Sequence, residues 1–292
     1  MRVFVAGATG AVGRLLVPML VEAGHQVTGT SRTAEGAERV RRQGAAAARV
    51  DVYDAGGLRR AVAAAAPDVV IHQLTDLSGA DGAANGRLRR EGTRNLVDAA
   101  RAAGVRRIVA QSIAWVYAPG PAPADESAPL DVEAEPPRAG MVAAVRALEE
   151  TAAELETAVV LRYGILYGPG TWYAPGGPVA AALSGDPAAT FLGSLVADDS
   201  VSSFVHVADA ARAAVAALEW PAGPVNVVDD EPAPGRAWLP VLAKALGAPE
   251  PEPVAGRLGW ARGAVNGLAR SRGWRPERPS WRSGFAERDA GV

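Results

Sequence analysis

A glycine-rich turn near the N-terminus constrains the fold of this chain more than any other feature. Gly7, Gly10 and Gly13 follow a short apolar run, residues 2–6, and precede an apolar, helix-like stretch. Glycines at this spacing permit a tight turn, a close approach of the backbone to a pyrophosphate and close packing of the helix on the strand. The first amides of the helix then point toward the phosphates. We therefore predict a dinucleotide site at Gly7, Thr9, Gly10, Ala11, Val12 and Gly13; a plain glycine loop is the alternative.

Apolar runs alternate with alanine-rich stretches through the first two-thirds of the chain. This alternation is typical of repeated βαβ units and a parallel sheet. The expected strands are residues 2–6, 26–30, 48–52, 68–72, 107–111 and 158–162, and the expected helices are 12–23, 35–43, 58–66, 87–103 and 142–156. The sequence thus predicts an α/β fold, a Rossmann-like doubly wound parallel sheet of six strands.

After residue 163 the chain changes to loops rich in Gly, Pro and Trp. A strand at 202–207, a helix at 207–218, a strand at 225–228 and a helix at 238–246 are expected there. We interpret residues 1–163 as a dinucleotide-binding domain and residues 164–292 as a smaller substrate-binding lobe, interleaved with the first into one structural unit. Residues 118–139 show no periodicity. This segment is either an active-site flap or a mobile linker, and the sequence does not distinguish between the two.

The end of the second expected strand bears on the choice of cofactor. An NAD enzyme places an acidic residue there to bind the ribose 2′-hydroxyl, whereas this chain has Ser31 and Arg32. These side chains can hydrogen-bond and ion-pair with a 2′-phosphate, so NADP(H) is the predicted cofactor; a solvated surface arginine is the alternative. Five further residues are expected to line the adenine and the middle of the cofactor: Asp51, Val52, Gln73, Leu74 and Thr75.

Composition excludes several classes of protein. A net charge of -2 gives no electrostatic case for nucleic acid or an anionic membrane surface as partner. The chain has no cysteine and three scattered histidines, so we expect no thiolate nucleophile and no metal site. We expect no signal peptide, because the N-terminal apolar run is short, and no run of about 20 apolar residues occurs without charge. We therefore expect a cytoplasmic protein that binds a small-molecule substrate; a homodimer is common in this fold and stays open.

Several further motifs resemble the extended or atypical short-chain dehydrogenase/reductase superfamily, the group that includes NAD-dependent epimerases and dehydratases. They are EGTRNLVDAA at 91–100, QSIAWVY at 111–117, LRYGILYGPG at 161–170, FVHVAD at 204–209 and GWRP at 273–276. The resemblance covers nearly the whole chain. It implies an enzyme with a bound nicotinamide dinucleotide, which Gln111 and Tyr163 would also contact.

The redox chemistry of this superfamily rests on a Tyr-x-x-x-Lys pair. The ammonium lowers the pKa of the phenol, which passes a proton while the nicotinamide passes a hydride. This chain lacks the pair, because Lys244 is the only lysine and Pro240 stands four residues before it. Alignment through Glu149 places Met141 and Val145 at the tyrosine and lysine positions. The usual mechanism therefore cannot be transferred to this chain residue by residue.

Other family positions are altered as well. Arg89 replaces an asparagine, Ile113 a serine or threonine, and Trp115 the acid of the dehydratases. The remaining candidates for catalytic groups are three hydroxyls: Ser112, Tyr163 and Tyr167. A buried serine bonded to backbone and aromatic packing are the alternatives. Charged candidates for the pocket are Arg89, Arg162 and Asp76.

An aromatic wall for a planar or apolar substrate is predicted from Trp115, Trp172 and Tyr173, with core packing as the alternative. Together these features favour an NADP(H)-dependent oxidoreductase that acts on a small or medium-sized carbonyl or hydroxyl compound with a non-standard proton donor. Two alternatives remain. One is a non-redox lyase, isomerase or cyclase with bound nucleotide, and the other is a non-catalytic NADP(H) sensor.

Overall fold

The computed structural model describes residues 1–75, 82–192 and 195–287, without the side chains of 190–192. It divides into two compact units. The first comprises Met1–Ser112, Val132–Leu161 and Ala211–Val225, and the second comprises Ile113–Asp131, Arg162–Ala210 and Asn226–Val292. The units interleave, because the chain leaves the first unit and returns to it twice.

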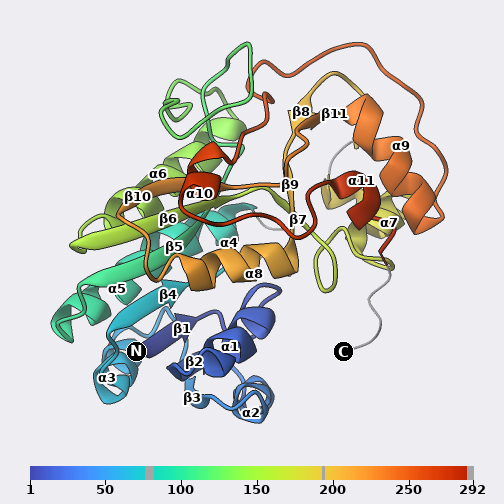
Figure 1. Ribbon diagram of the computed structural model, residues 1–292. Coiled ribbons are helices and arrows are strands. Elements are labelled where there is room, and N and C mark those ends of the chain that lie inside the picture. Colours follow the sequence, from blue (N-terminus) through green and yellow to red (C-terminus); the bar gives the residue numbers. More distant parts are fainter. Residues whose placement is uncertain (76–81, 193–194, 288–292) are drawn as a thin grey trace. The chain divides into compact units, whose positions relative to one another are not determined.

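A seven-stranded sheet with the strand order β10-β6-β5-β4-β1-β2-β3 is the frame of the first unit (Figure 1). Its strands are β1 Arg2–Ala6, β2 Gln26–Ser31, β3 Ala46–Arg49, β4 Val69–His72, β5 Arg107–Ile113, β6 Thr157–Tyr163 and β10 Gly223–Val227. The pairs of β1 with β2 and β4, of β2 with β3, and of β4 with β5 are all parallel. The predicted doubly wound sheet is confirmed, but it has one strand more than predicted. The strand expected in the smaller lobe at 225–228 is an edge strand of this sheet.

Helices cover both faces of the sheet. On one face α3 Ala55–Ala65, α5 Thr93–Ala102 and α6 Arg138–Ala152 pack side by side; α1 Gly13–Glu22 and α2 Ala34–Arg42 belong to the other. The segment expected as one helix at 87–103 is three pieces: α4 Gly82–Arg87, a π-helical turn at Leu88–Gly92, and α5. Helix α8, Val207–Ala216, lies partly in each unit along the sequence.

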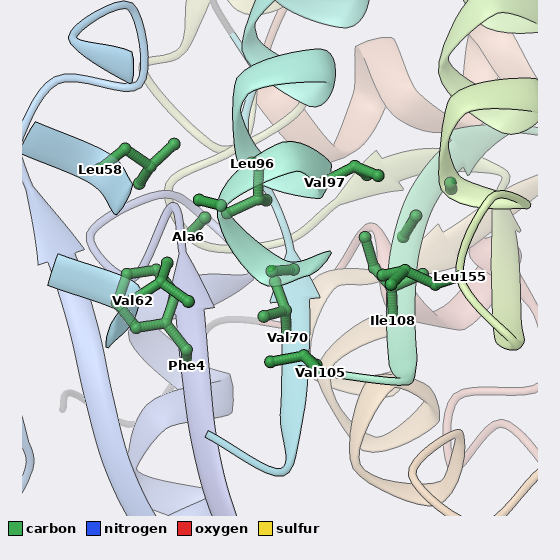
Figure 2. Packing of buried hydrophobic residues seen from close by; sticks show 14 of the residues in the cluster. Phe4, Ala6, Leu58, Val62, Val70, Leu96, Val97, Val105, Ile108 and Leu155 are labelled. Atoms are coloured by element: carbon green, nitrogen blue, oxygen red, sulfur yellow. The ribbon is translucent and has the colours of Figure 1, made fainter. Parts of the chain in front are cut away.

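The two-residue period of the strands explains the two buried faces. Phe4 and Ala6 of β1 and Val70 of β4 point into one core cluster with Leu58 and Leu96 of the covering helices (Figure 2). The residues between them in the strands are buried as well, against the opposite face. A strand buried on both faces reads as a continuous apolar run, which is why the pattern predicted a parallel sheet.

The second unit contains two small sheets and short helices. Strands β7 Ile165–Tyr167 and β9 Phe204–His206 are parallel, and β8 Val201–Ser202 and β11 Ala233–Pro234 are antiparallel. The helices are α7 Pro178–Leu183, α9 Gly235–Leu246, α10 Gly267–Ser271 and α11 Trp281–Gly284, with a 3-10 turn at Pro187–Leu192. Its core is aromatic: Phe204 packs edge-on against Trp238 and Phe285.

Candidate functional site

The glycine turn has backbone geometry that other residues could not adopt. Gly7 has a φ of +91°, and a Cβ there would lie 2.5 Å from the carbonyl oxygen of Gln73. At Gly13 a Cβ would lie 2.8 Å from the Cα of Ala8. Gly10 differs, because the nearest atom to an added Cβ would be the Gly7 oxygen at 3.4 Å. Two of the glycines thus allow close packing, and the third keeps one side of the turn open.

The backbone amides of this turn determine whether it can bind an anion. The Gly10 amide donates to the Gly7 oxygen at 3.1 Å, and the Arg14 amide to the Gly10 oxygen at 3.0 Å. Among the hydrogen bonds of the described residues, none uses the amides of Ala11 and Val12. Amides without a protein acceptor at the start of a helix are donors for phosphate oxygens.

A pocket in the first unit joins the ends of four strands. The lining residues are Ala6, Gly7, Thr9 and Gly10 after β1; Thr30, Ser31 and Arg32 at β2; Val50, Asp51, Val52 and Tyr53 after β3; Gln73, Leu74 and Thr75 after β4; and Leu58 and Leu88 from the helices. Ten residues predicted to bind the cofactor therefore line one pocket. Ala11, Val12 and Gly13 are next to it in the sequence, and Gln111 is not among the lining residues.

The end of β2 offers a positive charge to this pocket. Arg32 is exposed, and within the described ranges its side chain makes no hydrogen bond or ion pair. The Ser31 hydroxyl is already used, because it donates to the Thr33 oxygen at 3.1 Å and accepts from the Thr33 amide at 3.2 Å. Arg32 is thus the stronger candidate of the two for binding a phosphate.

The segment after β3, which was predicted to meet the adenine, lines this pocket with Val50, Asp51, Val52 and Tyr53. A carboxylate oxygen of Asp51 accepts from the Tyr53 amide at 2.9 Å, and the Val52 oxygen accepts from the Asn95 side chain at 2.9 Å. The guanidinium of Arg87 lies 4.4 Å from the centre of the Tyr53 ring. The sequence analysis missed Tyr53 and the apolar lining residues. The position of Tyr53 two residues after Asp51 was the available signal.

A buried network fixes the segment after β4. Gln111 donates to the Leu74 oxygen at 2.8 Å, and the Leu74 amide donates to Nδ1 of His72 at 3.3 Å. The other ring nitrogen of His72 lies 2.9 Å from the Thr93 hydroxyl. Burial, and to a lesser extent the charge of Arg89, lowers the pKa of His72 to about 4. Gln111 therefore positions the lining segment instead of lining the pocket itself.

Ser112 is not among the residues that line the pocket, and its side chain contacts α6. Its hydroxyl donates to Oε1 of Glu149 at 2.7 Å, and the residue is 3% exposed. Ser112 lies on the same side of β5 as Ile108 and Ala110, which face the helices. The structure thus gives this candidate catalytic hydroxyl a protein partner.

The two tyrosines predicted as catalytic are buried in the second unit. Tyr163 is 2% exposed, and its hydroxyl lies 3.4 Å from the Ala210 oxygen. Tyr167 is 1% exposed, and its ring meets those of His206 and Phe285 edge-on. Burial chiefly, with nearby carboxylates, raises the pKa of Tyr167 far above its usual value. Tyr167 thus lies in a packing environment, which was the alternative to a catalytic role, and the catalytic role stays a prediction.

The predicted aromatic wall is divided between two environments. Tyr173 packs against Phe204 and Trp238 at centroid distances of 5.9 and 6.4 Å, and burial raises its pKa to about 12. Trp172 packs against the same core cluster, whereas Trp115 is 37% exposed. The alternative of core packing therefore describes Trp172 and Tyr173 better than a substrate wall does.

The charged candidates for the pocket do not lie together in one unit. Arg162 donates to the Tyr117 hydroxyl at 3.0 Å, and this hydroxyl donates to Asn226 at 2.6 Å in the interior of the second unit. Asp76 lies outside the described residues. Arg89 is buried in the first unit, at the π-helical turn.

Neither a metal centre nor a membrane span is found in the part of the chain that the structure describes. No group of three or more His, Asp or Glu side chains there could hold a metal ion. No helix there is long and apolar enough to cross a bilayer.

A glycine turn with available amides, at the carboxyl edge of a doubly wound parallel sheet, defines a dinucleotide-binding protein of the Rossmann type. The chain belongs to the NAD dependent epimerase/dehydratase family, whose sequence model matches residues 3–228. A 3-diazoavenalumate denitrifying reductase from Streptomyces sp is 47% identical over 310 residues, which cover 98% of this chain and 99% of the relative.

Solved structures of sugar-nucleotide epimerases share the fold. The UDP-glucose 4-epimerase of Thermus thermophilus, in complex with NAD, is 27% identical with a TM-score of 0.74, over 98% of this chain and 97% of that one. The UDP-glucose 4-epimerase of Thermotoga maritima is 22% identical with a TM-score of 0.75, over 98% and 96% of the two chains. The predicted fold and family are confirmed, and the chain is an enzyme that uses a nicotinamide dinucleotide.

Proposed function

We propose that this enzyme is an NADPH-dependent reductase that replaces the diazo group of an organic carboxylate with hydrogen. The support is the full-length relative, a reductase whose name gives a diazo compound as its substrate. The proposal changes the expected substrate class from a carbonyl or hydroxyl compound to a diazo compound. The reason lies in the proton donors of this chain.

Reduction of a carbonyl leaves an alkoxide, so it requires a proton donor beside the substrate. The single observation that carries the proposal is that α6 has no such donor at the positions where the family places its catalytic tyrosine and lysine. The family's tyrosine and lysine positions hold Met141 and the buried Val145. The hydroxyl of Ser112 is bonded to Glu149. A carbonyl reductase would lack its acid here.

Reduction of a diazonium carbon requires no acid. A hydride forms the new C–H bond, and the C–N bond breaks as its electron pair leaves with N2. The balance is R–N2⁺ + NADPH → R–H + N2 + NADP⁺, with no proton taken up or released. Bound NADPH supplies the hydride. The protein then has to position the two reactants and exclude competing nucleophiles, and a site without an acid is suited to that task.

The residues of the first unit would bind the cofactor in a fixed order along the sheet. Arg32 at β2 would pair with the 2′-phosphate, which favours NADPH over NADH. The amides after Gly10 would hold the pyrophosphate. Asp51 and Val52 would meet the adenine, and Thr75, with Gln73 and Leu74, would border the middle of the cofactor.

The test is to mix the purified enzyme with NADPH and 3-diazoavenalumate labelled with ¹⁵N in the diazo group. We expect loss of absorbance at 340 nm, release of labelled N2, and deuterium in the product when the NADPH carries deuterium at C4. Heat-denatured enzyme measures the direct reaction of the two reagents. A stable NADPH signal with the diazo compound, together with oxidation by an aldehyde such as benzaldehyde, would instead identify a carbonyl reductase. Release of N2 without oxidation of NADPH would identify a non-redox enzyme.

A further inference from the structure

Arg89 is a buried cation for which the described residues offer no partner. Its side chain is 7% exposed, and burial lowers the pKa of its guanidinium to about 10, so it is charged at neutral pH. Over residues 1–75, 82–192 and 195–287, no hydrogen bond or ion pair of this side chain is found. None of its nitrogens is among the fully buried side-chain atoms without a partner. The guanidinium is nevertheless largely withdrawn from water, so an anion that reached it would form a strong charge-assisted pair.

The local backbone also departs from regular helix at this residue. Arg89 lies in the π-helical turn Leu88–Gly92, between α4 and α5. Such turns interrupt α-helices at functional sites more often than elsewhere. The turn packs against α6, the helix with Met141 and Val145 at the family's tyrosine and lysine positions. Arg89 therefore brings a positive charge to a turn that packs against α6, whose lysine position holds the uncharged Val145.

Two observations place Arg89 at the edge of the sheet that carries the cofactor pocket. Leu88, the preceding residue, lines this pocket. The Nε2 atom of His72, the last residue of β4, lies 2.9 Å from the hydroxyl of Thr93, which directly follows the π-helical turn, and the segment after His72 lines the same pocket. Arg89 thus belongs to the end of β4, one strand beyond the glycine turn at the end of β1.

The strand order decides which anion can reach Arg89. NADPH carries negative charge only on its 2′-phosphate and its pyrophosphate. Arg32 at β2 and the glycine turn at β1 account for these two groups. The part of the cofactor that would extend toward β4 is the nicotinamide riboside, which has no anionic group. The anion that pairs with Arg89 must therefore come from the substrate.

We propose that Arg89 binds the carboxylate of the substrate and so positions it for hydride transfer. A guanidinium offers two parallel N–H donors that match the two oxygens of a carboxylate. The identity of that carboxylate rests on the proposed function, because a diazo-bearing organic acid supplies one. The binding site itself does not depend on the chemistry at the diazo carbon.

The test uses avenalumate, the compound that remains when hydrogen replaces the diazo group, because it binds without reacting. Its affinity and that of its methyl ester are measured by calorimetry on the enzyme saturated with NADP⁺. We expect the acid to bind the native enzyme at least about 10-fold more tightly than the ester. This ratio should fall to about 1 in Arg89→Met and be partly kept in Arg89→Lys. The matched control is Arg90→Met, since Arg90 is exposed in the same turn.

Thermal unfolding without ligand gives a second, independent readout. If the side chain of Arg89 has no partner in the ligand-free enzyme, Arg89→Met removes an unpaired charge from a largely buried position. The Tm of this variant should then equal or exceed that of the native enzyme. A Tm several degrees lower in Arg89→Met but not in Arg89→Lys would show a structural partner and overturn the proposal. An acid-to-ester ratio near 1 in the native enzyme, or one unchanged in Arg89→Met, would overturn it as well.

Failure of this inference can be told from failure of the proposed function. Binding of avenalumate that depends on Arg89, without oxidation of NADPH by 3-diazoavenalumate, would support the anion site and contradict the reaction. Oxidation of NADPH at native rates by Arg89→Met would support the reaction and contradict the anion site.

Discussion

Ser112 at the end of β5 donates a 2.7 Å hydrogen bond to Oε1 of Glu149 in α6. In the sequence analysis Ser112 directly follows the expected strand 107–111, near the expected nicotinamide, so its position predicted a catalytic hydroxyl. In a strand, alternate side chains point to the same face, so Ser112 lies on the face of β5 that carries Ile108 and Ala110. That face packs against the covering helices. The hydroxyl therefore joins a strand to its covering helix.

Replacement of Ser112 by alanine is expected to lower stability and to spare activity. The hydrogen bond to a carboxylate contributes about 1–3 kcal/mol, and its loss should reduce the free energy of unfolding by that order. The kcat for diazo reduction should stay within about twofold. Urea denaturation and steady-state rates measure the two effects. A large loss of kcat at unchanged stability would restore the catalytic assignment of Ser112.

Arg32→Ala is expected to remove the preference for NADPH. A charge-assisted pair with a phosphate contributes about 1.5–3 kcal/mol, so the affinity for NADPH should fall at least about 10-fold while that for NADH stays the same. Fluorescence titration with each cofactor measures this. Arg39→Ala is the matched control, because Arg39 is an exposed arginine of the neighbouring helix α2. An equal change in the affinities for NADPH and NADH in Arg32→Ala would show that Arg32 does not bind the 2′-phosphate.

Tyr167→Phe is expected to leave both activity and folding intact. The Tyr167 hydroxyl is buried and has no hydrogen-bond partner among the described residues. Removal of an unsatisfied buried hydroxyl should keep the free energy of unfolding unchanged or raise it by up to about 1 kcal/mol. Tyr117→Phe is the control, because the Tyr117 hydroxyl donates to Asn226 and accepts from Arg162, so stability should fall there. A loss of kcat in Tyr167→Phe would contradict the packing role.

Most of the residues that line the pocket of the first unit could be predicted because their signals are local. The glycine turn and Arg32 are each identified by residue type at a fixed distance from a strand, and their roles toward a cofactor stay predictions. Leu58 and Leu88 line the same pocket. The sequence pattern of an apolar residue does not distinguish a pocket-lining position from a core position. Their role depends on which elements meet in space.

Pairings between distant segments were the other limit. The apolar run that contains Val225 predicted a strand, but its place beside β6 depends on a contact across more than fifty residues. The start of α3 shows the opposite case. Asp54 caps this helix by accepting from the Gly57 amide at 2.9 Å, and this local signal would have placed the start of the helix correctly.

His72 is expected to make stability depend on pH between about 4 and 6.5. Its pKa is about 4 in the folded protein and 6.5 in the unfolded chain, so only the unfolded chain takes up a proton in this range. Acidification therefore favours unfolding, by about 3 kcal/mol once the pH reaches 4. Unfolding free energies measured from pH 7 to 4.5 should fall less steeply in His72→Gln than in the native enzyme. His25→Gln serves as the comparison, and equal slopes in the native enzyme and His72→Gln would contradict the prediction.

Gly10→Ala is expected to separate cofactor binding from folding. An added Cβ at Gly10 would meet only the Gly7 oxygen at 3.4 Å, so the turn can keep its shape and stability should change by less than about 1 kcal/mol. The methyl group would nevertheless occupy the open side of the turn, where the pyrophosphate must approach the backbone. Affinity for NADPH and NADH should therefore fall together, each at least about 10-fold.

Gly7→Ala provides the contrast. Its φ of +91° and the 2.5 Å approach to Gln73 predict a loss of stability of about 1–3 kcal/mol or more, whatever the ligand. Unchanged affinity in a folded Gly10→Ala would show that the cofactor does not lie on this turn.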